Sequence, residues 1–294
     1  MKETGLKLFV SDMDGTLLQK DFTISKEDVE AIRNLQEQGI CFAVATGRIY
    51  FDAKTICEKH GLMPYIISNN GTCVYSADGK LLYSRPIQKD ILDELISYLE
   101  ESKLCYGVGT SHHFITDICW ENKLDEEVQS LEQRGIEIPE QTLKFAKEEL
   151  VQQNGIMFVE HIDELVNIPE IAYSISIVTF DQNKIEKLKE RLEEYETLTH
   201  MVSGPHNIEI TEKRGNKGNA IEYICSLLHL SLEQVAAVGD NLNDLCMLEK
   251  AGRKIAVENA REEVKAVCDF ITKSYTCSGV AYAIHNFINE TVAK

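Results

Sequence analysis

The fold of this chain is decided by the stretch Leu8–Leu18, which reads LFVSDMDGTLL and places two carboxylates directly after a short apolar run. The run is too short for a helix, and Gly15 breaks its regularity where the carboxylates appear. We therefore predict a buried strand with Asp12 and Asp14 at its carboxyl end. In open parallel α/β sheets, ligands bind at that end of the strands. Taken alone, Asp-x-Asp-Gly is equally typical of a turn or a helix cap.

Composition limits the class of protein. The chain has 294 residues, of which 44% are hydrophobic, enough for two domains with separate cores. No apolar run approaches the ~20 residues of a membrane span, and the N-terminus lacks the pattern of a signal peptide. Nine cysteines are scattered without metal-site spacing or the framework of a small secreted domain. We expect a cytoplasmic protein with reduced cysteines.

The charge balance restricts the partners. Net charge is −18, with 48 acidic against 30 basic side chains. Such a chain repels nucleic acid and anionic membranes over long range. We therefore expect no nucleic-acid or membrane partner, and an anionic substrate would need a local cationic site.

The first 84 residues alternate helix and strand patterns. Ser25 is placed to cap a helix that Gly39 ends, and an apolar run over 40–45 follows. This strand, helix and strand make a βαβ unit, in which both strands end at one edge of a parallel sheet. A helix over 50–60 and a strand over 65–68 extend it. Residues 73–83 then read as a hairpin with an Asp-Gly turn.

The alternation of helix and strand patterns stops near Arg85 and begins again near Thr211. The middle mixes helices with short strands, which predicts an α+β domain over 85–210. After a polar, glycine-containing linker, the last part again alternates helix and strand patterns, with an apolar strand over 235–238. The fold class we predict is α/β: a Rossmann-like parallel-sheet core formed by 1–84 and 211–294, with the middle domain inserted in it.

Polar residues follow four of the predicted strands. They are Asp12 with Asp14, Thr46, Asn70, and Asp240 with Asp244, while Lys217 opens a helix between the last two. In a parallel sheet these groups meet at one edge, where α/β enzymes keep their sites. Like charges ~4 Å apart repel by roughly 4 kcal/mol at an effective dielectric near 20. The cluster thus favours a divalent cation, and oxygen ligands favour Mg²⁺.

These groups suit phosphoryl transfer. One carboxylate can attack phosphorus and form an aspartyl-phosphate, and the other can serve as general acid and base. Asp12, at the strand end, suits the nucleophile, and Asp14 suits proton transfer. The Thr46 hydroxyl and the backbone N–H groups after Asp12 would hold the phosphoryl oxygens, while Lys217 would offset charge.

Four motifs together resemble the haloacid dehalogenase (HAD) superfamily of phosphohydrolases. In chain order they are Asp12–Leu18, Ala45–Arg48, Asn216–Gly218 and Gly239–Asp244. The chain is similar to the Cof-type subfamily, whose α/β cap domain is inserted between the second and third motifs. The segments Ser68–Gly71 and Ser203–Ile210 strengthen the likeness, which spans the whole length.

The resemblance implies a role for each motif residue. Asp12 would be the nucleophile, Asp14 the acid/base, and Thr46 and Lys217 phosphoryl ligands. Asp240 would bind Mg²⁺ beside the Asp12 carboxylate and the Asp14 backbone carbonyl, with Asn243 and Asp244 supporting the metal or Lys217. The candidate phosphate- and substrate-binding residues are Met13, Thr46, Gly47, Arg48, Asn70 and Asn243. Cap sequences vary within the family, so substrate contacts there are not implied.

Plainer interpretations stay open for several of these residues. Asp240 and Asp244 could cap the next helix. Arg48 could be an ordinary charge at a helix start, and Asn70-Gly is also plain turn chemistry. A lone Lys217 would read as a solvated surface lysine.

The function expected is that of a Mg²⁺-dependent phosphatase, a phosphoric monoester hydrolase acting on a small phosphorylated metabolite such as a sugar phosphate or a phosphorylated cofactor. It would work as a monomer or homodimer, through an aspartyl-phosphate on Asp12. The alternatives are a phosphomutase acting on a sugar phosphate and a non-catalytic phospho-accepting or regulatory protein.

Overall fold

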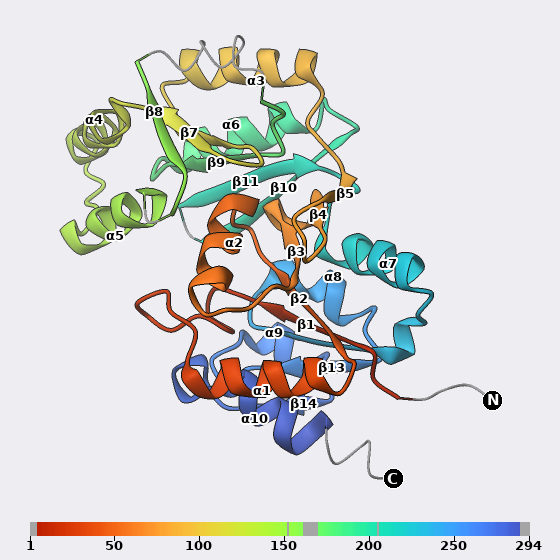
Figure 1. The fold of residues 1–294 in the computed structure, drawn as a ribbon. Coiled ribbons are helices and arrows are strands. Elements are labelled where there is room, and N and C mark those ends of the chain that lie inside the picture. Colours follow the sequence, from red (N-terminus) through yellow and green to blue (C-terminus); the bar gives the residue numbers. More distant parts are fainter. Residues whose placement is uncertain (1–4, 152, 161–169, 205, 289–294) are drawn as a thin grey trace. The chain divides into compact units, whose positions relative to one another are not determined.

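The computed structural model describes residues 5–151, 153–160, 170–204 and 206–288, and the chain falls into two compact units (Figure 1). One comprises 1–84 and 215–294, the other 85–214. The sequence placed the second crossing at 210/211. The difference arises because β11 (Asn207–Glu212) continues through the first two residues of the expected linker.

The first unit is built on a mixed sheet. Its eight strands among the described residues have the order β14-β13-β12-β1-β2-β3-β4-β5. Their bounds are β1 (Leu8–Asp12), β2 (Cys41–Ala45), β3 (Tyr65–Ser68), β4 (Cys73–Tyr75), β5 (Leu81–Ser84), β12 (Val235–Gly239), β13 (Arg253–Ala256) and β14 (Phe270–Ile271). The neighbours from β14 to β3 are parallel, and β4 and β5 add an antiparallel hairpin. The α/β fold class is confirmed, with β1 near the centre of the sheet.

Helices connect these strands. They are α1 (Lys26–Glu37), α2 (Tyr50–Lys59), α7 (Lys217–Leu228), α8 (Leu245–Leu248), α9 (Glu262–Lys265) and α10 (Gly279–Ala283). The Ser25 hydroxyl accepts from the Asp28 N–H and caps α1, and Gly39 follows its end at φ +76°, so both predicted signals are confirmed. Helix α1 packs against α10, and α7 against α8 (Figure 1).

The second unit is an α+β domain. Its sheet has the order β10-β11-β9-β6-β7-β8 among the described residues, with β7 and β8 parallel and the other neighbours antiparallel. The bounds not yet given are β6 (Cys105–Gly109), β7 (Phe114–Asp117), β8 (Ile156–Val159), β9 (Ser174–Val178), β10 (Leu198–Gly204), α3 (Lys89–Glu101), α4 (Trp120–Gln133), α5 (Glu140–Val151) and α6 (Gln182–Leu192).

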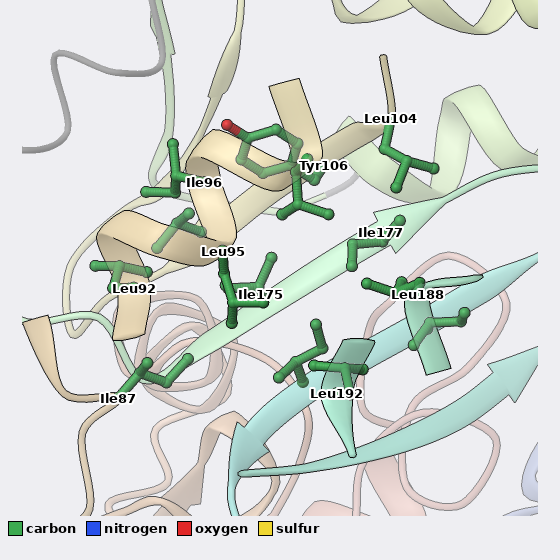
Figure 2. Close-up of a cluster of buried hydrophobic side chains, with 14 of the residues drawn as sticks. Ile87, Leu92, Leu95, Ile96, Leu104, Tyr106, Ile175, Ile177, Leu188 and Leu192 are labelled. Carbon is green, nitrogen blue, oxygen red and sulfur yellow. The ribbon is translucent and has the colours of Figure 1, made fainter. Parts of the chain in front are cut away.

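The core of the second unit lies between two helices and the sheet. Figure 2 shows Leu92 and Leu95 of α3 and Leu188 of α6 meeting Ile175 and Ile177 of β9. All five side chains are buried, and each contributes about 1.5–3 kcal/mol when removed from water. This unit therefore has its own hydrophobic core. Among the described residues of the whole chain, no helix is both long and apolar enough to cross a membrane.

Gly71 ends the turn after β3 and lies against the start of α7. Its φ is +102°, and a Cβ placed there would lie 2.2 Å from the Asn216 carbonyl carbon and 2.5 Å from the Lys217 nitrogen. Gly39 also has a positive φ, but nothing lies within 4 Å of its Cβ position. The first turn of α7 thus packs directly on Gly71.

We expect Gly39→Ala to lower the free energy of unfolding by about 1–2 kcal/mol, the cost of the left-handed backbone alone. Gly71→Ala should cost clearly more, because the backbone at Asn216 must move as well. Urea unfolding of both variants measures the difference. Equal losses in the free energy of unfolding would show that the close approach of Gly71 to Asn216 does not contribute to stability.

Candidate active site

Three carboxylates from two distant segments of the first unit meet at the carboxyl end of β1. Asp12 ends β1, Asp240 directly follows β12, and Asp244 ends the 3₁₀ turn after it. One oxygen of each lies within 4.8 Å of the other two. The parallel pairing of β1 with β12 explains the meeting, since both strands end at the same edge.

Lys217 lies between two of these acids. Its Nζ donates to Asp12 Oδ1 at 2.6 Å and to Asp244 Oδ1 at 2.7 Å, and its side chain is 0% exposed. Burial alone would lower the pKa of this lysine, but the charges of Asp12 and Asp244 outweigh burial and raise that pKa. Lys217 is therefore a fixed cation. The Asn216 side chain caps α7 and so holds the lysine at the first position of the helix.

Asp244 organises the loop as well as the lysine. Its second oxygen accepts from the backbone N–H groups of Asp240 and Asn241 at 2.9 and 3.1 Å. A carboxylate with both oxygens engaged has little capacity left for a ligand. Asp244 thus holds both the Lys217 ammonium and the backbone of the Asp240 loop.

Negative charge is in excess at the cluster. Asp12, Asp240 and Asp244 face one ammonium, that of Lys217. Burial and the charge of Asp244 raise the pKa of Asp240 to about 6, against a hydrogen bond from the Thr16 hydroxyl that lowers it. Burial and Asp244 also raise the pKa of Asp12 well above its usual range, and Lys217 offsets only part of this.

The donor set fits a hard divalent cation. Asp12 Oδ2 is buried without a hydrogen-bond partner, beside an excess of negative charge. Gly15, at φ +78°, leaves room that a Cβ would fill, since that atom would lie 2.7 Å from Asp240 Oδ2. An unpaired oxygen among carboxylates is the arrangement that such a cation satisfies.

The Asp14 side chain lies outside this cluster. It is 48% exposed, and both its oxygens accept from Arg48, at 2.6 and 2.8 Å. Arg48 Nη1 also donates to Asp52 at 2.5 Å, and its guanidinium carbon lies 5.0 Å from the centre of the Phe22 ring. The sequence paired Arg48 with phosphate or substrate, whereas here it pairs with two acids.

Thr46 and the two asparagines lie along the same edge. Thr46 is buried, and its Oγ1 accepts from the Arg48 backbone N–H, which leaves the hydroxyl proton for donation. Asn70 has a left-handed backbone, and its side-chain oxygen accepts from Asn243 Nδ2 at 3.1 Å. The Asn243 oxygen is buried without a partner.

Met13 and Gly47 could bind a phosphate or substrate only through their backbone groups. The Met13 side chain is fully buried, and its carbonyl accepts from the N–H groups of Leu17 and Leu18, which forms the tight turn after Asp12. Gly47 has no side chain and is half-buried between Thr46 and Arg48.

Three residues at the site were not predicted from the sequence. Thr16 holds Asp240, Asp52 holds Arg48, and Phe22 packs on the guanidinium. The spacing of Arg48 and Asp52, four residues apart at the start of α2, is the one signal that could have indicated their pairing. The contacts of Thr16 and Phe22 depend on loop geometry.

An acid cluster around a buried lysine, at the strand ends of an α/β sheet, defines an enzyme site of the doubly wound class. Residues 9–284 match the family described as haloacid dehalogenase-like hydrolase. The phosphatase YwpJ of Bacillus subtilis (strain 168) is 34% identical and covers 96% of this chain and 100% of its own. The chain belongs to the haloacid dehalogenase-like hydrolase family, which confirms the resemblance drawn from the four motifs.

Two further comparisons agree. The 5-amino-6-(5-phospho-D-ribitylamino)uracil phosphatase YwtE of the same organism is 32% identical over 98% of this chain and 100% of its own. A solved structure of a haloacid dehalogenase-like hydrolase from B. subtilis superposes with a TM-score of 0.82 at 34% identity, covering 96% of this chain and 100% of that one. The likeness therefore includes both units.

The raised pKa of Asp240 makes stability depend on pH in the metal-free protein. The folded carboxyl, with a pKa of about 6, takes up a proton that the unfolded one does not bind until about pH 4, so stability rises as the pH falls through 6. We expect Asp240→Asn to be more stable than wild type by on the order of 1–2 kcal/mol near pH 7, with the difference shrinking toward pH 5. Urea unfolding with chelator present measures it; a difference independent of pH would contradict this origin.

Proposed function

We propose that this protein is a Mg²⁺-dependent phosphatase that hydrolyses a small phosphomonoester through an aspartyl-phosphate on Asp12. One observation carries the proposal: a buried carboxylate at the centre of the sheet edge, fixed through one oxygen by Lys217 and unpaired at the other beside Asp240. The phosphatase names of the two relatives support it.

The Asp12 carboxylate, the Asp240 carboxylate and the Asp14 backbone carbonyl would hold the Mg²⁺. When bound there, the ion would offset the carboxylate charges and those of the phosphoryl oxygens. It would also favour the ionised form of Asp12, which the surrounding acids otherwise disfavour. That form is the nucleophile the reaction needs.

In the first step the Asp12 carboxylate attacks phosphorus, and the ester bond to the leaving alcohol breaks. Lys217 Nζ, already donating to Asp12 Oδ1, keeps the carboxylate oriented and offsets the charge that develops on the phosphoryl group. The Thr46 hydroxyl donates to a phosphoryl oxygen. Asp14, two residues beyond the nucleophile and half exposed, donates the proton to the leaving oxygen.

In the second step a water molecule hydrolyses the aspartyl-phosphate. Asp14 now accepts a proton from the water as its oxygen attacks phosphorus, and the bond from phosphorus to Asp12 breaks. The products are inorganic phosphate and the free Asp12 carboxylate. One residue serves as acid and then as base, because the first step leaves it ionised for the second.

The substrate is a small phosphorylated metabolite, a sugar phosphate or a phosphorylated cofactor or its precursor. The name of the YwtE relative, which specifies a phosphoribityl compound, supports this class. The inserted unit over 85–214 would act as the cap that selects the substrate. A cytoplasmic enzyme, working as a monomer or homodimer, fits such a metabolite.

We expect Asp12→Asn to abolish hydrolysis of p-nitrophenyl phosphate, because an amide cannot form the phosphoenzyme. Asp28→Asn provides a matched control: Asp28 is also a fully buried aspartate of the first unit, but it bonds to Ser25 and the Ala281 N–H, away from the cluster. The control should keep wild-type turnover. Turnover of Asp12→Asn at the wild-type rate would overturn the nucleophile assignment.

We expect EDTA to stop turnover and Mg²⁺ to restore it. Mg²⁺ affinity, measured by calorimetry, should weaken as the pH falls below about 6, because Asp240 and Asp12 must lose their protons to bind the ion. Full activity in chelator would rule out the metal. Release of inorganic phosphate without a sugar bisphosphate activator separates a phosphatase from a phosphomutase, and a screen of phosphorylated metabolites then identifies the substrate.

A further inference from the structure

Arg48 directs three of its five guanidinium N–H groups at two acids. Nε and Nη2 donate to the two oxygens of Asp14 at 2.8 and 2.6 Å, and Nη1 donates to Asp52 Oδ2 at 2.5 Å. The Asp52 side chain is 0% exposed, whereas that of Asp14 is 48% exposed. The guanidinium thus bridges one buried and one exposed carboxylate.

Arg48 itself is held from several directions. Asp52 lies in the first turn of α2 and fixes the far side of the guanidinium. The Phe22 ring covers its face at 5.0 Å. Its backbone N–H donates to Thr46 Oγ1, and its carbonyl accepts from the Asn69 N–H. These contacts fix the position of the guanidinium, and the guanidinium in turn orients the exposed Asp14 side chain.

The contact engages both oxygens of Asp14. Each accepts a hydrogen bond from the arginine side chain. A two-point fork fixes the plane of the carboxylate as well as its position, which a lysine cannot do. The lone pairs on the far side of each oxygen remain for a proton. A carboxylate held in a fixed orientation is what the second step needs, when a proton must leave the attacking water.

We propose that Arg48, anchored by the buried Asp52, is a positioning residue that holds Asp14 as the base for breakdown of the aspartyl-phosphate. This inference rests on the proposed phosphatase function. In the step concerned, the water oxygen bonds to phosphorus, its proton passes to Asp14, and the bond from phosphorus to Asp12 breaks.

The choice of substrate separates the two steps. p-Nitrophenolate is a stable anion near neutral pH, so it leaves without a proton and forms the phosphoenzyme with little help from Asp14. Breakdown still requires the base. Loss of Asp14 positioning should therefore lower kcat for p-nitrophenyl phosphate and leave kcat/KM nearly unchanged, with phosphoenzyme accumulating.

For Arg48→Lys we expect kcat to fall by about tenfold or more, with a rapid burst approaching one p-nitrophenolate per chain before the slow steady state. Asp52→Asn should show the same signature although its buried side chain cannot touch substrate. Phe22→Leu, at a partly exposed loop position, should show a smaller loss of the same kind. This last variant keeps the test available if either of the others fails to fold.

Two matched controls accompany these variants. Asp28→Asn changes a buried aspartate in the first turn of α1, as Asp52→Asn does in α2. Arg33→Lys changes an arginine that bonds to the His60 carbonyl. Neither should alter the ratio of kcat to kcat/KM or the burst.

The results separate the possibilities. A fall in kcat/KM through a raised KM, without a burst, would overturn the inference and make Arg48 a substrate ligand. Equal falls in kcat and kcat/KM without a burst would also overturn it, as a general structural defect. If wild type fails to hydrolyse the substrate in Mg²⁺, the proposed function itself fails.

Discussion

The buried contact between Lys217 and the carboxylates of Asp12 and Asp244 is the constraint on which the rest of the site depends. An unpaired charge in the interior is costly, so a fully buried lysine must have acids around it. Here the acids outnumber the cation, and burial together with the excess negative charge raises the pKa of Asp12 and of Asp240. The site thus keeps a local attraction for cations in a chain that is acidic overall.

The fold provides this geometry by bringing distant segments to one edge. Strand β1 lies between β2 and β12, so residues more than 200 positions apart end side by side. Two glycines then allow the backbone segments that carry the site residues to pack closely together. Gly71 lets the start of α7 pack on the turn after β3, and Gly15 leaves space beside Asp240. The lysine and the carboxylates are consequently held by the backbone rather than by flexible side chains alone.

Much of this arrangement could be predicted because it follows from strand ends. Asp12, Thr46, Asn70 and Asp240 each follow a short apolar run, and parallel pairing brings such positions together. Strands β6, β7 and β10 of the second unit were not predicted from the sequence. Strand β6 contains two glycines, and β10 interrupts its apolar residues with polar ones. Helix α4 was also not predicted, although its buried apolar residues recur at helical spacing, at Trp120, Leu124, Val128 and Leu131. The contacts of Arg48 with Asp14 and Phe22 depend on loop conformation, which periodicity does not specify.

In the mechanism we propose, two groups of charged residues have separate roles. The cluster around Lys217 would act on phosphorus, and the pair of Arg48 and Asp14 would transfer the proton. The most direct test is to mix the enzyme with substrate and Mg²⁺, quench rapidly, reduce with borohydride and identify the modified residue by peptide mass spectrometry. An aspartyl-phosphate at Asp12 would be reduced to homoserine at that position, only when substrate is present. Reduction at Asp14, Asp240 or Asp244 instead, or at no residue during active turnover, would contradict an aspartyl-phosphate on Asp12.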